Sequence, residues 1–256
     1  MMLHPLDTVW FFQPATLNPE LLNLDRKVPF YDAPKFRIMG DRSVLVELGD
    51  EISPAINQSV QELFAKIDSN PAKGILDLIP SYRSLLVVYD PLRISLDEIK
   101  GEIIDIWKNS AQCRMPPPQT VKIPVVYGGE RGPDLQQVAL YHDLTPQEVI
   151  DFHTGPTYRV YMIGFTPGYP YLGEVLDAIA TPRRETPRTI VPKGSVGIAQ
   201  KQTGIYSVDS PGGWQIIGWT PLKLFDLDGQ PPSHLVMGDR VKFFAITEQE
   251  AAQWLT

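Results

Sequence analysis

A basic stretch from Thr181 to Lys201 carries the residues best suited to bind an anion. It holds five cations against the single acid Glu185, a local charge of +4 in a chain of net charge −7: Arg183, Arg184, Arg188, Lys193 and Lys201. Arginine on a loop restrained by proline can bind a carboxylate or phosphate through two parallel hydrogen bonds. The same composition fits a solvated basic loop, so both interpretations stay open.

Two glycine-rich turns follow this stretch or lie within it, Gly194-Ser195-Val196-Gly197 and Ser210-Pro211-Gly212-Gly213. Glycine lets a ligand approach the backbone closely, but such sequences also serve as ordinary turns between strands. Neither turn matches the phosphate-binding pattern G-x-x-x-x-G-K-[ST] or the nucleophile pattern G-x-S-x-G. The turns therefore suggest a binding region without indicating a reaction.

His153 is the histidine with the most organised setting, the last turn of an expected helix, where the helix dipole favours the protonated form. It could act as a general base, anchor a substrate or simply end the helix. The other histidines, His4, His142 and His234, form no H-x-H or H-E-x-x-H pattern. We therefore expect no metal site.

Aromatic side chains gather in the glycine- and proline-rich part of the chain: Phe165, Tyr169, Tyr171, Tyr206 and Trp214. Tyrosine and tryptophan can line a pocket while one end of the ring system forms a hydrogen bond. The alternative is a place in the core, which we favour for Phe165. The segment Gln202-Thr203-Gly204 adds an amide and a hydroxyl that could orient a small polar substrate or form a turn.

Composition excludes several classes of protein. The chain has 256 residues and one cysteine, Cys113, which excludes an intrachain disulfide framework and any zinc site that needs two thiolates. No apolar run reaches the roughly 18 residues of a membrane span. The apolar segment Val9–Phe12 lacks the preceding basic residue of a signal peptide. The mild acidity argues against nucleic acid as the main partner. We therefore expect a cytoplasmic protein that binds neither nucleic acid nor membrane.

The first part of the chain divides into an arm and a small domain. Residues 1–34 contain five prolines and keep no helical or strand period, which indicates an N-terminal arm, either a plain tail or packed coil. Residues 35–113 alternate strands and amphipathic helices in the order β-β-α-β-β-α. Ser53-Pro54 and Ser95-x-x-Glu98 mark the two helix starts. This order predicts a mostly antiparallel sheet covered by helices.

Residues 114–120 contain consecutive prolines, which favour a stiff linker and mark a domain boundary. From residue 121 to 256 the chain contains one capped helix after Thr145-Pro146-x-Glu148 and then short apolar segments between glycines and prolines. The segments expected as strands are 121–126, 160–165, 196–199, 204–208, 214–219, 222–226 and 241–245. Many short strands with such punctuation indicate a barrel or sandwich.

Five ordered motifs resemble the allophanate hydrolase subunit 1 family. They are YRVYMIGFTPGYPYLG (158–173), ATPRRETPR (180–188), VPKGSVGIA (191–199), QTGIY (202–206) and SPGGWQIIG (210–218). Shorter matches lie upstream: GDRS (40–43), PSYRS (80–84), YDPL (89–92) and YGGE (127–130). The likeness covers roughly residues 35–244. The family includes the B subunit of bacterial 5-oxoprolinase, a sporulation-kinase inhibitor subunit and part of the carboxyltransferase region of urea carboxylase.

The resemblance implies a cyclophilin-like β-barrel behind the small domain, without implying prolyl isomerase activity. It also implies partners: a carboxyltransferase-like (KipA-like) C subunit and, for 5-oxoprolinase, a third subunit of the LamB/YcsF type. That complex opens the lactam of 5-oxoproline to glutamate with ATP and magnesium. The ATP site would lie in this chain or in its partner, and this chain alone would be inactive.

The family motifs place a functional face on particular residues. Arg183 or Arg188 would pair with a carboxylate or phosphate, and Gln202 and Thr203 would hydrogen-bond an amide or lactam. His153 would lie nearby as acid, base or orienting group. The residues that would complete a substrate site are Phe165, Pro167, Gly168, Tyr171, Gly194, Ser195, Tyr206, Ser210 and Trp214.

The sequence departs from the family's pattern at three places: the first 34 residues look like an addition, Trp219 stands where arginine is expected, and Gln200-Lys201 replaces a small, glycine-containing stretch. Two alternatives to a part in 5-oxoprolinase stay open. One is a protein inhibitor of a sensor histidine kinase. The other is a component of the urea or allophanate pathway, although the chain has no biotin-acceptor Met-Lys pair.

Overall fold

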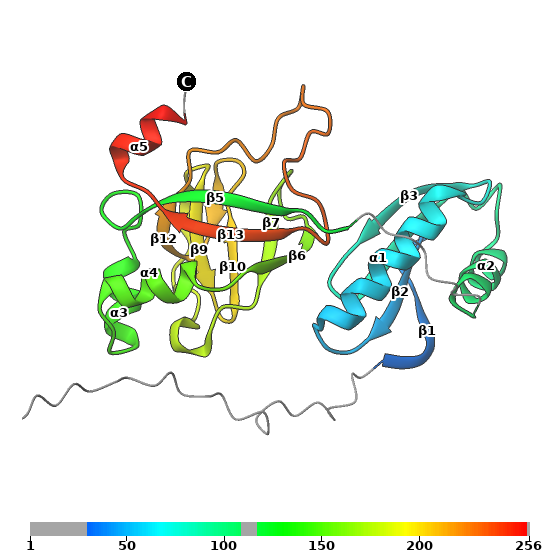
Figure 1. Cartoon of the computed structure of the whole chain (residues 1–256). Helices are drawn as coiled ribbons and strands as arrows, with labels where there is room; N and C mark the ends of the chain where they lie inside the picture. The colour runs from blue at the N-terminus through cyan, green and yellow to red at the C-terminus, as the bar shows by residue number, and fades with distance from the viewer. Residues whose placement is uncertain (1–29, 109–116, 255–256) are drawn as a thin grey trace, which may run out of the picture.

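The computed structural model describes residues 30–108 and 117–254, which form two lobes side by side (Figure 1). One lobe is a four-stranded sheet with two helices, and the other is built on a closed barrel of seven strands. This confirms the predicted α+β fold, with a β-β-α-β-β-α unit ahead of a barrel. Within the two described ranges, no helix is long and apolar enough to span a bilayer.

The small lobe is an antiparallel sheet in the order β1-β2-β4-β3. Its elements are β1 (Phe30–Ile38), β2 (Ser43–Gly49), α1 (Pro54–Ser69), β3 (Ile75–Pro80), β4 (Ser84–Tyr89) and α2 (Leu96–Lys108). The apolar residues at helical spacing in α1, among them Ile56, Val60 and Ile67, are buried against the sheet. The capping box of α2 forms as predicted, since the Ser95 N–H donates to the Glu98 carboxylate at 2.8 Å.

The first strand begins earlier than the sequence indicated. β1 starts at Phe30, inside the segment 1–34 that was expected to be an arm, and Phe30 pairs with Gly49 of β2. The register of this pairing shifts between Phe30 and Lys35, and this irregularity conceals the strand period in the sequence. The rest of the expected arm lies outside the described residues. So do residues 114–116 of the expected linker, and its last residue, Thr120, already belongs to the next strand.

The barrel closes in the order β10-β7-β6-β13-β5-β12-β9. Its strands are β5 (Thr120–Tyr127), β6 (Tyr158–Ile163), β7 (Pro170–Gly173), β9 (Ser195–Ala199), β10 (Gln202–Ile205), β12 (Gln215–Trp219) and β13 (Arg240–Ala245). β13 runs parallel to β5 and antiparallel to β6, and so the last barrel strand lies between the first two.

Several elements surround the barrel: α3 (Leu135–Tyr141), α4 (Pro146–Thr154), the 3-10 helix η2 (Asp177–Ile179), the paired short strands β8 (Arg188–Val191) and β11 (Ser210–Gly212), and α5 (Glu248–Gln253). Figure 1 shows α3 and α4 together beside one end of the barrel. Their apolar residues Val138 and Val149 are fully buried with Ile123 and Phe243 in the main core. The capping box that opens α4 at Thr145 forms as predicted.

Three differences from the expected elements have a common cause. The segment 222–226 is not a strand, and only Phe225 forms an isolated bridge, to Ser233. The short strands β7, β8 and β11 and the seven-residue helix α3 were not expected. Elements of three to seven residues owe their form to tertiary partners, and a short sequence window does not record those partners.

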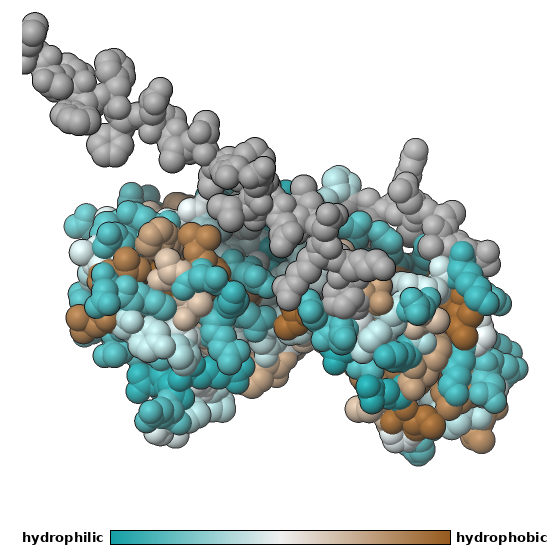
Figure 2. Space-filling model, turned by 90° about the horizontal axis from the view of Figure 1, so that it is seen from below, coloured by the Kyte–Doolittle hydropathy of each residue, from teal (hydrophilic) through white to brown (hydrophobic). Residues whose placement is uncertain are grey.

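The two lobes are joined by a polar contact built on Asn57 of α1, which is fully buried. Its Nδ2 donates to the carbonyl of Tyr161 at 2.9 Å, and its Oδ1 accepts from Nε of Arg159 at 3.0 Å. Gln61, one turn later, accepts from Arg159 at 3.1 Å and donates to the Met237 carbonyl at 2.7 Å. On the face shown in Figure 2, apolar residues form separate groups on both lobes. The lobe junction is therefore specified by polar pairing as well as by apolar burial.

Candidate functional site

A cluster of aromatic rings lies where the two lobes meet. The ring centroid of Tyr169 lies 4.9 Å from that of Tyr171, 5.2 Å from Tyr206 and 5.8 Å from Trp214. Tyr82, from the turn between β3 and β4 of the small lobe, lies 5.8 Å from Tyr171. Phe165 lies 5.7 Å from Tyr169. We call this set the aromatic face: Tyr82, Phe165, Tyr169, Tyr171, Tyr206 and Trp214.

Arg183 lies at the edge of the aromatic face with an exposed side chain. Within the described ranges it has no hydrogen bond and no ion pair. Burial raises the pKa of Tyr171 and of Tyr206, and the positive charge of Arg183 opposes this rise at both hydroxyls. Arg183 therefore brings an uncompensated charge to the aromatic face, where it can bind a carboxylate or phosphate.

Gln202 adds an amide to the same region. It starts β10 and pairs with Gly173 of β7 and Ala199 of β9. Its side-chain Nε2 donates to the hydroxyl of Tyr82 at 2.5 Å. In the described part of the chain its amide oxygen has no partner. Gln202 thus links the barrel to the small lobe and keeps one acceptor available for a ligand N–H group.

The loop between β6 and β7 fixes how Phe165 is displayed. Phe165 has a positive φ of 67° and is 61% exposed. The core position favoured for it from the sequence is therefore wrong. The following turn is held by the Ser207 hydroxyl, which donates to the Pro167 carbonyl at 2.5 Å. Gly168 has a φ of 74°, and a Cβ there would lie 2.7 Å from Cβ of Phe225. Pro167 and Gly168 therefore shape the loop that presents Phe165.

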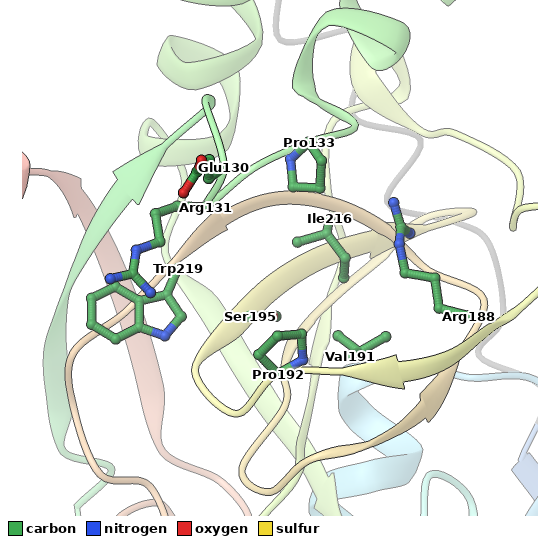
Figure 3. Close-up of a pocket in the computed structure, with 9 residues that line it drawn as sticks. All are labelled: Glu130, Arg131, Pro133, Arg188, Val191, Pro192, Ser195, Ile216 and Trp219. Carbon is green, nitrogen blue, oxygen red and sulfur yellow. The ribbon is translucent and has the colours of Figure 1, made fainter.

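A cavity of about 90 Å³ lies on the other side of the basic loop (Figure 3). Its charged lining residues are Glu130, Arg131 and Arg188, and Ser195 lies in its floor. The guanidinium of Arg131 stacks on the ring of Trp219, 4.0 Å from the centroid. Trp219, which stands where arginine was expected, thus holds an arginine from another segment. The expected loss of an anion contact at this position is therefore offset by Arg131.

Arg188 is partly committed to a structural contact. Asp134, only 4% exposed, accepts from Arg188 at 2.7 Å and from Arg184 at 3.0 Å, and its second oxygen accepts from the N–H of Ile216 at 2.6 Å. These three donors offset the free-energy cost of burying the carboxylate. Of the two arginines proposed for anion binding, Arg183 is unpaired and Arg188 shares a carboxylate.

His153 lies in the barrel interior with no exposed surface. Its Nδ1 is 2.7 Å from the Tyr127 hydroxyl, and its Nε2 is 2.9 Å from the Thr203 hydroxyl, which donates to the Gly197 carbonyl at 3.0 Å. Since the Thr203 hydrogen is used at Gly197, Nε2 of His153 carries the proton and Nδ1 accepts from Tyr127. The expected protonated form is wrong: burial lowers the pKa of His153 to about 3 and outweighs the helix dipole.

Two further expected site residues lie near the cavity. Gly194 has a φ of 84°, and a Cβ there would lie 2.5 Å from both the Thr220 carbonyl oxygen and Nε1 of Trp219. Gly194 is therefore required for the close approach of Trp219. Ser210 pairs with Val191, a residue of the cavity wall, and its buried hydroxyl has no hydrogen-bond partner in the described ranges.

The expected site residues thus fall into three groups. The structure brings the largest group together at the aromatic face: Phe165, Pro167, Gly168, Tyr171, Arg183, Gln202, Tyr206 and Trp214. The second group, at or beside the cavity, is Arg188, Gly194, Ser195 and Ser210. His153 and Thr203 form the third, inside the barrel. Val191 and Ile216 line the cavity and also pack in the core cluster of Tyr169, so the first two groups are neighbours.

Sequence reasoning missed Tyr82, Arg131 and Asp134. Tyr82 belongs to the upstream motif PSYRS, so the motif was noticed but no role was given to its tyrosine. Arg131 and Asp134 lie in a loop with no distinctive pattern, and their partners are 50 or more residues away. Nothing local in the sequence indicates such contacts. In residues 30–108 and 117–254, no group of three or more His, Cys, Asp or Glu side chains could hold a metal ion.

Comparison with known proteins gives related matches over most of the chain. The B subunit of 5-oxoprolinase from Bacillus subtilis (strain 168) is 43% identical over an alignment 222 positions long, which covers 83% of this chain and 92% of the relative. A urea amidolyase of Lachancea kluyveri is 25% identical over an alignment 274 positions long, gaps included, which covers 93% of this chain but 15% of that protein. The crystal structure of TTHA0988 is 37% identical with a TM-score of 0.72, and the match covers 80% of this chain and 40% of that one.

The matches agree with the resemblance carried by the sequence motifs. A family model described as the carboxyltransferase domain, subdomain C and D, matches residues 34–235, a range that holds most of both lobes, the aromatic face and the cavity but ends before β13. The high identity to a relative of similar length shows that the likeness is not confined to one lobe. This chain therefore belongs to the family of carboxyltransferase subdomains C and D.

Proposed function

We propose that this chain is a subunit of an ATP-dependent 5-oxoprolinase, which opens the lactam of 5-oxoproline to give glutamate. The observation that carries the proposal is the identity, over most of both chains, to a protein named as the B subunit of 5-oxoprolinase. The partners would be a carboxyltransferase-like C subunit and a LamB/YcsF-like third subunit. The urea amidolyase match supports the urea-pathway alternative less, because this chain corresponds to only 15% of that protein.

The aromatic face has chemistry that suits 5-oxoproline. This substrate is a flat lactam ring with one carboxylate. Arg183 can bind the carboxylate, and the free amide oxygen of Gln202 can accept from the lactam N–H. The tyrosine rings provide a surface for the ring itself. Tyr169, Tyr206 and Trp214 are buried, and so the half-buried rings of Tyr82 and Tyr171 would provide that surface. Because Arg183 and Phe165 beside them are exposed, we infer that a partner protein packs over this region and completes the site.

A lactam is stabilised by resonance, and ATP can activate it by phosphorylating the amide oxygen. Positive charge and N–H groups placed where negative charge develops then lower the barrier. Arg183 is suited to this role because no side chain of the described ranges neutralises it. The position of ATP and magnesium, in this chain or in its partner, belongs to the same proposal. His153 would act at a distance, by holding Thr203 and β10 in place beneath Gln202.

The test is ATP hydrolysis by this chain mixed with its C subunit and its third subunit, with and without 5-oxoproline. The complete set should hydrolyse ATP faster with 5-oxoproline, and this chain alone should show no activity. Arg183→Ala removes a charge-assisted contact, and so kcat/KM for 5-oxoproline should fall by roughly 10-fold or more. Gln202→Ala should lower it by less, since the lost hydrogen bond is neutral.

Arg42→Ala is the matched control, because Arg42 is an exposed arginine of the small lobe without a side-chain partner in the described residues. It should leave the rate unchanged. Absence of stimulation in a set whose subunits demonstrably bind one another would refute the proposed function. Inhibition of a sensor kinase's autophosphorylation by this chain alone would then support the regulatory alternative.

A further inference from the structure

The cavity beside the basic loop is not used by the proposed reaction at the aromatic face, yet its charges are unbalanced. Arg184 and Arg188 share one carboxylate, that of Asp134, and so one positive charge lacks a partner. Nη1 of Arg188 is buried and, in the described part of the chain, forms no hydrogen bond. A buried donor without an acceptor costs free energy, so the guanidinium of Arg188, which lines the cavity, is not fully satisfied by Asp134.

A second cation lies on the opposite side of the same cavity. Figure 3 shows Arg131 and Arg188 on opposite sides of the cavity, with the Arg131 guanidinium turned over the Trp219 ring and Glu130 on the Arg131 side. The ion pair of Arg131 with Glu248 at 3.2 Å is exposed, so it restrains Arg131 only weakly. The cavity therefore has a cation at each end and a carboxylate at one end.

The middle of the cavity is apolar except for one hydroxyl. Pro133, Val191, Pro192 and Ile216 form the walls between the two arginines. Ser195 is 3% exposed and lines the cavity, and its hydroxyl has no hydrogen-bond partner among the described residues. An unpaired hydroxyl in an otherwise apolar wall is a second feature that a ligand would satisfy.

We propose that this cavity binds an acidic amino acid. The side-chain carboxylate would pair with Arg188, the α-carboxylate with Arg131 and the α-ammonium with Glu130. The short aliphatic part would lie between the prolines and Ile216, with Ser195 beside it. A phosphate paired with Arg131 would meet the Glu130 carboxylate, and one paired with Arg188 would leave both Arg131 and Glu130 unused. A simple dicarboxylate would leave Glu130 unpaired. The arrangement therefore favours a ligand with two negative charges and one positive charge.

This inference deepens the proposed function, since the product of 5-oxoproline opening is the acidic amino acid glutamate. Only the identification of the ligand with the reaction product rests on the proposed function. The binding itself depends on the cavity alone and is measured on this chain without partners or ATP.

The experiment is calorimetric titration of the full chain with L-glutamate and with glutarate, which keeps both carboxylates but lacks the ammonium group. L-glutamate should bind more tightly than glutarate. Arg131→Gln changes an exposed position and leaves the core intact. It should lower the affinity for both ligands by roughly 10-fold or more. Glu130→Gln should lower the affinity for L-glutamate to that for glutarate and should leave the affinity for glutarate no lower than before. Arg42→Gln serves as the control and should change neither.

Equal affinity of glutamate and glutarate, or binding that is unchanged in Arg131→Gln, would overturn the proposal, as would the absence of heat with both ligands. Failure of the proposed function gives a different pattern. In that case the chain binds glutamate as expected, but the reconstituted subunits show no 5-oxoproline-dependent ATP hydrolysis. If that hydrolysis occurs and glutamate does not bind, the cavity proposal alone fails.

Discussion

Replacement of Asn57 by alanine should destabilise the protein by about 3 kcal/mol. The side chain is fully buried at the lobe junction, where it donates to the carbonyls of Tyr161 and Tyr82 at 2.9 and 3.2 Å and accepts from Arg159 at 3.0 Å. Alanine leaves three polar groups without this partner. Each such group costs about 1–3 kcal/mol when buried. We take the lower value for each, because water can enter the space that the amide leaves.

The measurement is denaturant unfolding followed by tryptophan fluorescence. Trp107 reports on the small lobe, whereas Trp214 and Trp219 report on the barrel. In the variant the transitions of the two lobes should also move apart, because a central contact between their independent cores is lost while those of Gln61 and Gln202 remain. A variant that unfolds in one transition at the unchanged denaturant midpoint would refute this reasoning.

Gln58→Ala is the matched control, since it lies on the same helix, is exposed and contacts only Glu62 in the described chain, at 3.0 Å. It should change the unfolding free energy by less than about 0.5 kcal/mol. If Asn57→Ala costs no more than this control, the junction is held by apolar packing and the polar contact is dispensable.

Two further predictions concern buried charge. The unfolded chain protonates His153 near pH 6.5, whereas the native chain does so near pH 3, so stability is full above pH 6.5 and falls by about 1.4 kcal/mol per pH unit below it. The unfolding free energy, measured from pH 7 to pH 4, should fall less steeply with pH in His153→Gln than in the unmodified protein. An unchanged dependence on pH would exclude a neutral buried imidazole. Asp134→Asn should cost about 3–5 kcal/mol in the same assay, because it leaves Arg184 and Arg188 without a counter-charge. Glu248→Gln, which affects only an exposed pair, should cost less than about 1 kcal/mol, and equal losses in the two variants would contradict the assigned role of Asp134.

The sequence predicts elements that carry their own signal. Helix α1 has apolar residues at helical spacing after Ser53-Pro54, and both its start and its buried face were predictable. The strand β8 was not, because its four residues follow no period and owe their conformation to pairing with β11. Local pattern describes a helix surface well, but a short strand is specified by a partner elsewhere in the chain.

The candidate site shows the same division. Arg183 and Arg188 each end a Thr-Pro-Arg sequence. In the described residues Arg183 is unpaired, whereas Arg188 contacts Asp134, which lies 54 residues away in the chain. The motif predicts that both occur on one loop, and only the fold distinguishes their roles. His153 likewise shows that a helix end predicts protonation only when the side chain is accessible to water, because burial reverses the preference.

The position of β13 has a consequence for synthesis. Because β13 lies between β5 and β6, these two strands lack a shared neighbour until residues 240–245 have left the ribosome. The small lobe needs only residues 30–108, whose strands pair over short distances, and so it can fold first. Until β13 is made, β5 and β6 each have an unpaired edge, and unpaired strand edges are sites for aggregation.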